Sequence, residues 1–155
     1  MSRVLILYTS LTGNTEILAE TIADYLKKHQ HEVTLKHFEQ DQITADEIKD
    51  YDATLIGIYT YDYGEIPFEV EFFFDELDEV DLTGCITGVF GAGDRFYGDT
   101  FGLAVDLMHD KLEERGATLD PERLKVDMDP EQDDIKRCEQ LAERVIQKAI
   151  GKVNT

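Results

Sequence analysis

The sequence predicts one α/β domain, a three-layer α/β/α sandwich whose five parallel strands are ordered 2-1-3-4-5. Three observations support this prediction. Short apolar runs alternate with longer segments of helical periodicity, which is typical of a parallel sheet covered by helices on both faces. The chain has 155 residues, a length that suits a single domain. Five strands also match one of the two common doubly wound strand orders.

The expected strands are short and mostly apolar. They cover residues 4–8, 33–37, 53–58, 85–90 and 119–128. The first, third and fourth are nearly continuous apolar runs, as expected of strands that are buried on both faces. The second alternates like an edge strand, and the fifth is broken.

Segments with helical spacing of apolar residues separate the strands. One follows residue 15, a second covers residues 68–77, and a third has its apolar face at Leu103, Leu107, Met108 and Leu112. The last helix is expected to start at an N-cap Asp129, with Pro130 in its first turn. The domain then covers residues 1–150, and residues 151–155 form a loose tail.

The charge of the chain is its most unusual bulk property. With 15 Lys and Arg against 34 Asp and Glu, the net charge is −19. No Lys or Arg lies between Lys49 and Arg95, a segment rich in acids. One side of the molecule should therefore be strongly negative, which excludes nucleic acids and anionic membranes as partners and favours basic proteins.

The two cysteines indicate a reducing environment. Cys85 and Cys138 lie far apart and in no metal-binding spacing, so both are expected to be buried free thiols. The apolar run after Met1 is too short for a signal peptide or a membrane span. These features predict a soluble, cytoplasmic protein.

The chemistry is expected in the loops that follow the first, third and fourth strands, because ligands of such sheets bind at the carboxyl ends of the strands. In the first loop, the hydroxyls of Ser10, Thr12 and Thr15 and the amide of Asn14 can donate to phosphate oxygens around Gly13. The loop is neither a Walker loop nor a dinucleotide fingerprint. A simpler reading is a helix capped by Thr12, but the position of the loop favours a phosphate site.

The other two loops offer aromatic and acceptor groups. The second loop contains Tyr59, Tyr61 and Tyr63, which form either a stacking platform for a flat ring or a cap on the sheet edge. The third loop, residues 91–102, offers glycines, the acceptor Asp94 and the aromatic Tyr97. Together the three loops provide a phosphate cradle, two aromatic walls and an acceptor at the ring edge.

At these residues the sequence resembles the flavodoxins. The run Ser10-Leu11-Thr12-Gly13-Asn14-Thr15-Glu16 matches their phosphate signature, and Val89-Phe90-Gly91-Ala92-Gly93-Asp94 with Tyr97 is similar to their third flavin loop. The resemblance spans essentially the whole chain, whose length suits the short-chain bacterial type. It implies a flavodoxin-like fold, one noncovalently bound FMN, and a low-potential one-electron carrier rather than an enzyme with its own substrate.

The resemblance also assigns roles by position. Ser10, Thr12, Asn14 and Thr15 bind the phosphate, Tyr97 stacks on the outer face of the flavin, and Asp94 accepts from the pyrimidine N3–H. The full set expected to contact FMN is Ser10, Leu11, Thr12, Gly13, Asn14, Thr15, Tyr59, Thr60, Tyr61, Asp62, Tyr63, Gly64, Gly91, Ala92, Gly93, Asp94 and Tyr97.

The second loop departs from the family pattern. Tyr61 takes the position of a usual Trp, and whether Tyr61 or Tyr63 covers the inner flavin face stays open. Asp62 stands where the family has a Gly whose peptide turns over when the flavin N5 is protonated. A non-Gly residue should make that turn more costly by about 1 kcal/mol, unless Gly64 supplies the flexible peptide.

The expected partners are basic redox proteins, namely a flavodoxin or ferredoxin reductase and electron-accepting enzymes, and the expected state is a monomer. The alternative function is an FMN-dependent NAD(P)H or quinone oxidoreductase on the same fold, although Arg95 is the only basic residue of the two ring loops. Flavin-bearing activators of ribonucleotide reductase are shorter. Phosphoacceptor receiver domains need acids where Tyr8-Thr9 and Tyr59-Thr60 stand.

Overall fold

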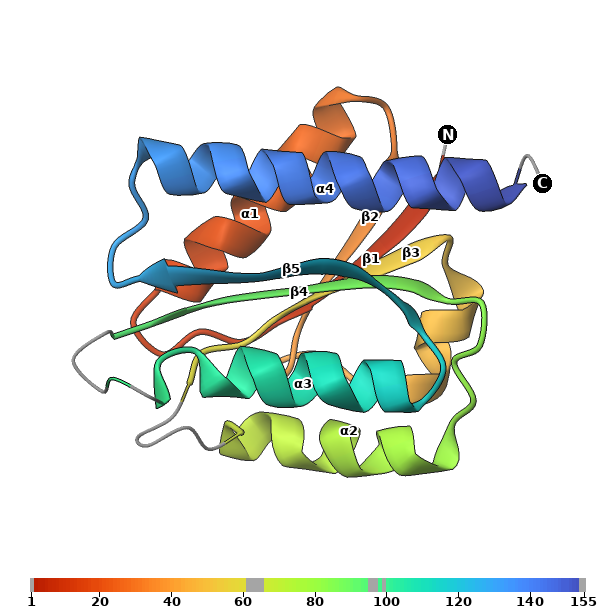
Figure 1. Cartoon of the computed structure of the whole chain (residues 1–155), viewed down its shortest axis with the longest axis horizontal. Helices are drawn as coiled ribbons and strands as arrows, with labels where there is room; N and C mark the ends of the chain where they lie inside the picture. The colour runs from red at the N-terminus through yellow and green to blue at the C-terminus, as the bar shows by residue number, and fades with distance from the viewer. Residues whose placement is uncertain (1, 61–65, 95–97, 99, 154–155) are drawn as a thin grey trace.

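Five parallel strands form one sheet in the order β2-β1-β3-β4-β5, as predicted. The computed structural model describes residues 2–60, 66–94, 98 and 100–153. Helices α1 and α4 cover one face of the sheet, and α2 and α3 cover the other (Figure 1). The elements are β1 (Arg3–Tyr8), α1 (Asn14–Lys28), β2 (Glu32–His37), η1 (Ala45–Asp50), β3 (Ala53–Gly57), η2 (Phe68–Val70), α2 (Glu71–Glu76), η3 (Leu77–Glu79), β4 (Ile86–Gly93), α3 (Leu103–Glu114), β5 (Thr118–Asp127) and α4 (Gln132–Val153).

The sheet is buried on both faces, which explains why its central strands have few polar residues. In β1, Val4 and Ile6 pack in the core with α1 and α4, while Leu5 and Leu7 pack in the core with α2 and α3. All four side chains are fully buried. A strand that contributes to two cores needs apolar residues at every position, and this is the origin of the continuous apolar run.

Strand β4 is longer than predicted. It continues through Gly91, Ala92 and Gly93, which the sequence placed in a loop, and these residues pair with Lys125, Val126 and Asp127 of β5. Its partner β5 is irregular, as its broken pattern indicated. Thr87 pairs with Leu119 but Val89 pairs with Arg123, so a bulge interrupts the pairing. The pairing of β4 with β5 therefore continues up to the carboxyl edge of the sheet.

Several helix predictions need correction. The helix expected over residues 68–77 is divided into η2, α2 and η3. On α3, Leu107 is 37% exposed, because the buried face runs through Ala104, Val105, Met108 and Leu112.

Helix α4 also differs from prediction at both ends. It begins at Gln132, so Asp129 is not its N-cap. The chain first turns at Met128, which has a left-handed φ of 57°. The helix continues to Val153, so residues 151–153 are helical rather than a loose tail.

The two thiols differ in burial. Cys138 is fully buried, and burial raises its pKa to about 12. Cys85 is only half-buried, so the prediction of two buried thiols is correct for Cys138 alone. Among the described helices, none combines the length and apolar character that crossing a bilayer requires.

Candidate functional site

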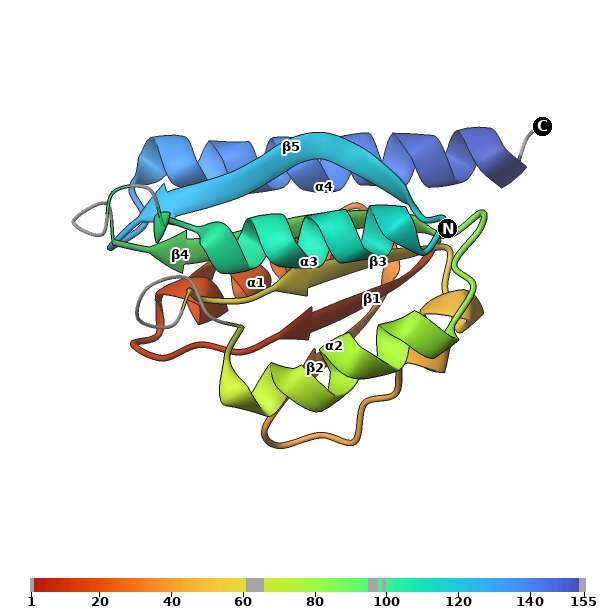
Figure 2. The same cartoon turned by 60° about the horizontal axis from the view of Figure 1, so that its bottom comes forward.

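A cavity of about 330 Å³ lies at the carboxyl edge of the sheet. Figure 2 shows that the ends of β1, β3, β4 and β5 meet there with the starts of α1 and α3. This is the edge predicted to hold the site, because the strands of a parallel sheet all end on the same side. The cavity is lined by Ser10, Leu11, Thr12, Asn14, Thr15, Tyr59, Thr60, Ala92, Gly93, Asp94, Thr100, Phe101, Gly102 and Met128.

The start of α1 leaves its backbone donors available to a ligand. Gly13 is the N-cap, with a left-handed φ of 94° and no side-chain hydrogen bond to the first turn. The reading of Thr12 as the N-cap is therefore wrong. The first helical hydrogen bond runs from the Ile17 N–H to the Gly13 carbonyl at 3.1 Å. The N–H groups of residues 14–16 precede that bond, and such groups with the positive end of the helix dipole favour an anion.

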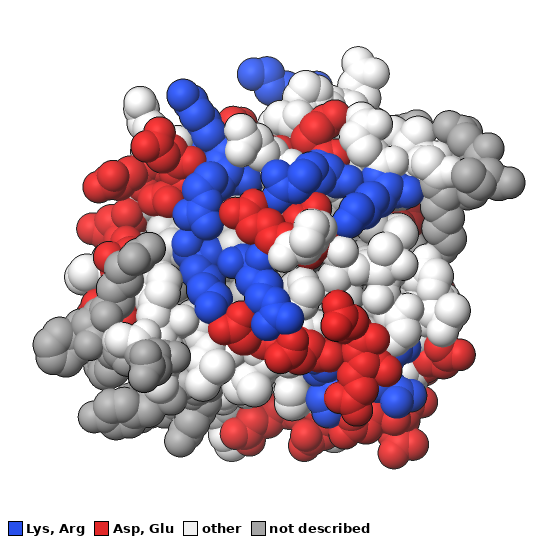
Figure 3. All heavy atoms as spheres, viewed as in Figure 1, with Lys and Arg blue, Asp and Glu red and all other residues white. Residues whose placement is uncertain are grey.

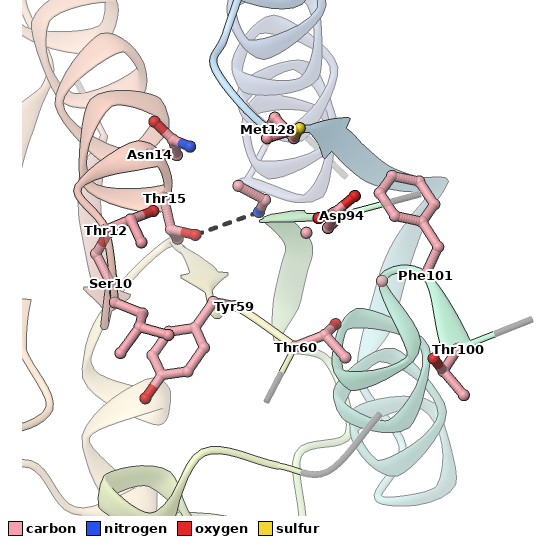
Figure 4. A pocket seen from close by; sticks show the side chains of 14 residues that line it. Ser10, Thr12, Asn14, Thr15, Tyr59, Thr60, Asp94, Thr100, Phe101 and Met128 are labelled. Atoms are coloured by element: carbon pink, nitrogen blue, oxygen red, sulfur yellow. Dashed lines mark hydrogen bonds between the residues drawn. The ribbon is translucent and has the colours of Figure 1, made fainter. Parts of the chain in front are cut away.

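Three hydroxyls of the cavity are held in place by backbone N–H groups. Ser10 Oγ accepts from the Gly13 N–H at 3.0 Å, and Thr15 Oγ1 accepts from the Ala92 N–H at 3.2 Å (Figure 4). Thr60 Oγ1 accepts from the N–H of Ala104, in the first turn of α3, at 3.2 Å. A hydroxyl has a single proton, and an oxygen that already accepts can still donate that proton. Each of these hydroxyls therefore still has its proton available to donate.

The Thr15 contact also joins two of the loops. Thr15 is 1% exposed, and the bond to Ala92 links the first turn of α1 to the end of β4. In Figure 4 the bond lies between the side of the cavity that carries Ser10 and Thr12 and the side that carries Asp94 and Phe101. The hydrogen-bond donors at the start of α1 and the end of β4 are therefore held at a fixed relative position.

The lining also contains aromatic and apolar side chains. Tyr59, Phe101 and Met128 face the cavity from three different segments, and Asp94 adds a carboxylate (Figure 4). The described lining contains no Lys or Arg. Among the described residues there is also no cluster of His, Cys, Asp and Glu that could hold a metal ion. The lining therefore combines hydrogen-bond donors with aromatic and apolar surface, a combination that suits a ligand with an anionic end and an apolar body.

The structure gathers most of the described residues that the sequence predicted for the site. Gly13 and Gly91 do not line the cavity: Gly13 is the N-cap of α1, and Gly91 lies within β4 directly before the lining residue Ala92. Four second-loop residues and Tyr97 fall outside the described part of the chain, so their roles stay predictions: Tyr61, Asp62, Tyr63, Gly64 and Tyr97. The predicted residues that line the cavity are Ser10, Leu11, Thr12, Asn14, Thr15, Tyr59, Thr60, Ala92, Gly93 and Asp94.

Four lining residues were missed by the sequence analysis. Thr100, Phe101 and Gly102 stand at the end of the third loop, just before α3 and beyond Tyr97, the last residue of the predicted set. Met128 directly follows β5. The rule that places ligands at the carboxyl ends of strands applies to the fifth strand as well, and it was the signal that could have found Met128.

Comparisons with known proteins show which family the chain belongs to. The family model described as Flavodoxin matches residues 6–141. Probable flavodoxin 1 of Bacillus subtilis is 38% identical over 92% of this chain and 89% of its own length. The flavodoxin of Maridesulfovibrio salexigens is 41% identical over 87% of this chain and 92% of its own.

Solved structures give the same result. A short-chain flavodoxin associated with a bacterial microcompartment superimposes with a TM-score of 0.89 at 37% identity, covering 96% of this chain and 99% of the other. Oxidised flavodoxin 1 from Bacillus cereus superimposes with a TM-score of 0.89 at 34% identity, covering 94% of this chain and 98% of the other.

Proposed function

Because this chain belongs to the flavodoxin family and is an FMN-binding electron carrier, we propose that its FMN lies in the cavity at the carboxyl edge of the sheet. The phosphate then lies in the loop 10–15, and the isoalloxazine ring lies between the second and third loops. The observation that carries this proposal is that the Ser10, Thr15 and Thr60 hydroxyls line the cavity while their oxygens accept backbone N–H groups, which leaves their protons for a ligand.

The donor set fits a phosphate. Ser10 and Thr15 offer hydroxyl protons, Thr12 and Asn14 add further side-chain donors, and the first turn of α1 adds its backbone N–H groups. Several donors that converge on one small volume suit a compact anion with three terminal oxygens. With no cation in the described lining, partial charges and hydrogen bonds carry the binding of this phosphate.

The remaining lining fits the ring. Tyr59, Phe101 and Met128 provide flat or adaptable apolar surface, and the Asp94 carboxylate can accept from a ring N–H. Bound FMN supplies one-electron chemistry, while the protein supplies binding, orientation and electrostatics. Each carboxylate about 10 Å from the ring opposes added negative charge by ~0.4–1.7 kcal/mol. We therefore propose that the carrier works at low potential.

Asp94→Ala should weaken FMN and riboflavin about equally, by about tenfold each, because both ligands carry the same ring and lose the same acceptor. Asp94→Asn is the matched control, since it keeps one carbonyl oxygen that can accept from the ring, and it should lose less. The measurement is quenching of flavin fluorescence by apoprotein. If Asp94→Ala changed neither affinity, Asp94 would not be the ring acceptor.

We propose that partners are basic redox proteins, such as a flavodoxin or ferredoxin reductase and electron-accepting enzymes, and that they dock on the acidic face built by segment 50–94. Glu71, Asp75 and Glu79 are exposed on α2 and η3. The same surface exposes Phe68 (85%) and Phe72 (76%). Carboxylates around two exposed aromatic rings suit a partner whose basic rim surrounds an apolar patch.

The distribution of Lys and Arg over another part of the surface supports docking on this acidic face. Lys and Arg side chains gather over β5 and α4 (Figure 3), but they are paired with acids. Arg123 contacts Asp106 at 3.1 Å and Arg144 contacts Asp120 at 3.0 Å. The cations are thus largely neutralised locally, and the excess negative charge lies elsewhere. The large net charge also supports a monomer, and the free thiols support a cytoplasmic location.

Association with a basic reductase should slow steeply as salt is added, because the field of surface carboxylates is screened within about 8–10 Å at ordinary ionic strength. Stopped-flow rates between low and physiological salt measure this effect. Phe72→Ser should speed dissociation at every salt concentration without changing the salt dependence of association. Association rates that are indifferent to salt would contradict docking on the acidic face.

A further inference from the structure

Glu69 lies outside the cavity but contacts two of the strand ends that form it. It belongs to η2, and its carboxylate accepts hydrogen bonds from two hydroxyls. Thr9 Oγ1 donates to Glu69 Oε2 at 2.5 Å, and the Tyr59 hydroxyl donates to the same oxygen at 3.0 Å. One carboxylate therefore joins the end of β1, the end of β3 and the start of η2.

These contacts lie at the base of the first and second loops. Thr9 is fully buried, directly precedes Ser10, and donates its backbone N–H to the Gly57 carbonyl at 3.0 Å. Tyr59 lines the cavity and directly precedes Thr60. A displacement of the Glu69 carboxylate would therefore also displace Thr9 and Tyr59, the residues at which the first and second loops begin.

The carboxylate is well suited to this position. It is an acceptor only, so two hydroxyls can converge on it without competition from a donor of its own. Burial raises the pKa of Glu69, but hydrogen bonds from Thr9, its own backbone N–H and Tyr59 lower the pKa below its ordinary value. Glu69 is thus ionised at neutral pH, and hydrogen bonds to an ionised group are the stronger kind. The neighbouring Val70 is fully buried and anchors η2 in the core.

We propose that Glu69 is a positioning residue for FMN, which holds the starts of the phosphate loop and the second loop at a fixed separation. The inference rests on the proposed FMN site. Phosphate and ring are parts of one covalent molecule, so both loops must be correctly spaced before the ligand can contact both. A spacing that is fixed beforehand reduces the ordering cost on binding.

The test compares Glu69→Gln with Glu71→Gln. The first keeps the side-chain shape but replaces one acceptor oxygen with an NH₂ group, and the second removes the same charge from an exposed carboxylate two residues away. Titration of apoprotein into FMN gives the dissociation constants, and urea unfolding gives the stability of each apoprotein. Glu69→Gln should raise the FMN dissociation constant about tenfold relative to Glu71→Gln.

Riboflavin separates positioning from a purely structural role. It lacks the phosphate and cannot bridge the two loops, so Glu69→Gln should weaken riboflavin far less than FMN. A purely structural contact would lower the stability of the apoprotein and weaken both flavins alike. The inference is overturned if the two flavins are weakened equally, or if Glu69→Gln and Glu71→Gln have the same FMN affinity.

Thr9 provides a second route if Glu69→Gln fails to fold. Thr9→Val removes one donor to the carboxylate, and Thr9→Ser keeps it. Thr9→Val should weaken FMN more than riboflavin, Thr9→Ser should bind both like the parent protein, and equal behaviour of the two variants overturns the inference. If instead the parent protein shows no preference for FMN over riboflavin, the proposed phosphate site fails, and the two failures are distinguishable.

Discussion

Riboflavin should bind this protein at least about a hundredfold more weakly than FMN, because the loop 10–15 concentrates its donors on the one group that riboflavin lacks. A hydrogen bond to a charged group contributes about 1.5–3 kcal/mol. The loss of two such bonds, from Ser10 and Thr15, already exceeds a hundredfold. Equal affinity for the two flavins would contradict the placement of the phosphate in this loop.

Thr15→Val should lower FMN affinity by about tenfold to a hundredfold, because it removes a donor to the phosphate. The contacts that the other two loops make with the flavin ring should not change. The Thr15 oxygen also accepts from the Ala92 N–H, so the variant leaves a buried donor without its acceptor. That structural cost falls on both flavins, and the ratio of FMN to riboflavin affinity isolates the loss at the phosphate.

Thr15→Ser is the matched control, because it keeps the hydroxyl that accepts from Ala92 and donates to the ligand. Its FMN to riboflavin ratio should stay close to that of the parent protein. Fluorescence titration of the three apoproteins with each flavin provides all six affinities. If the valine variant kept the parent ratio, Thr15 would not contact the phosphate.

The parts of this fold that the sequence predicts correctly are those set by local pattern. β1 and β3 are nearly continuous apolar runs because the sheet is covered on both faces, and α1 has helical spacing because it buries one stripe, with Leu18, Ile22 and Leu26 fully buried. The donors of the first loop are adjacent in sequence. Their convergence therefore needs only a strand, a glycine turn and a helix start.

The features that were missed depend on contacts between distant segments. Gly91 to Gly93 are strand rather than loop because β5 pairs with them, and no local pattern contains that partner. Glu69 reads as one acid among many, and its role depends on Thr9, 60 residues away in the sequence. Met128 is an exception, because it directly follows β5 and the strand-end rule applies to it without any distant contact.

Gly91→Ala should destabilise the apoprotein by more than about 3 kcal/mol, because the added methyl group would overlap a backbone oxygen that cannot move aside like the end of a side chain. A Cβ at Gly91 would lie 1.9 Å from the carbonyl oxygen of Ile58 and 2.8 Å from Val105 Cγ2. The Ile58 N–H donates to the Phe90 carbonyl at 3.1 Å, which holds the two strand ends together. Urea unfolding of the apoprotein measures the loss.

Gly88→Ala is the matched control in the same strand. Its Cβ would lie 3.2 Å from Leu55 Cδ2 and 3.2 Å from Val145 Cγ2, which are the ends of side chains that can shift by a few tenths of an ångström. We expect a loss of about 1 kcal/mol there, at the low end for overpacking.

Excess FMN should partly restore the stability of the Gly91→Ala variant, since a ligand that binds only the folded state stabilises that state. An apoprotein of parental stability that binds FMN poorly would instead make Gly91 a direct FMN contact, as the resemblance to the flavodoxins implied.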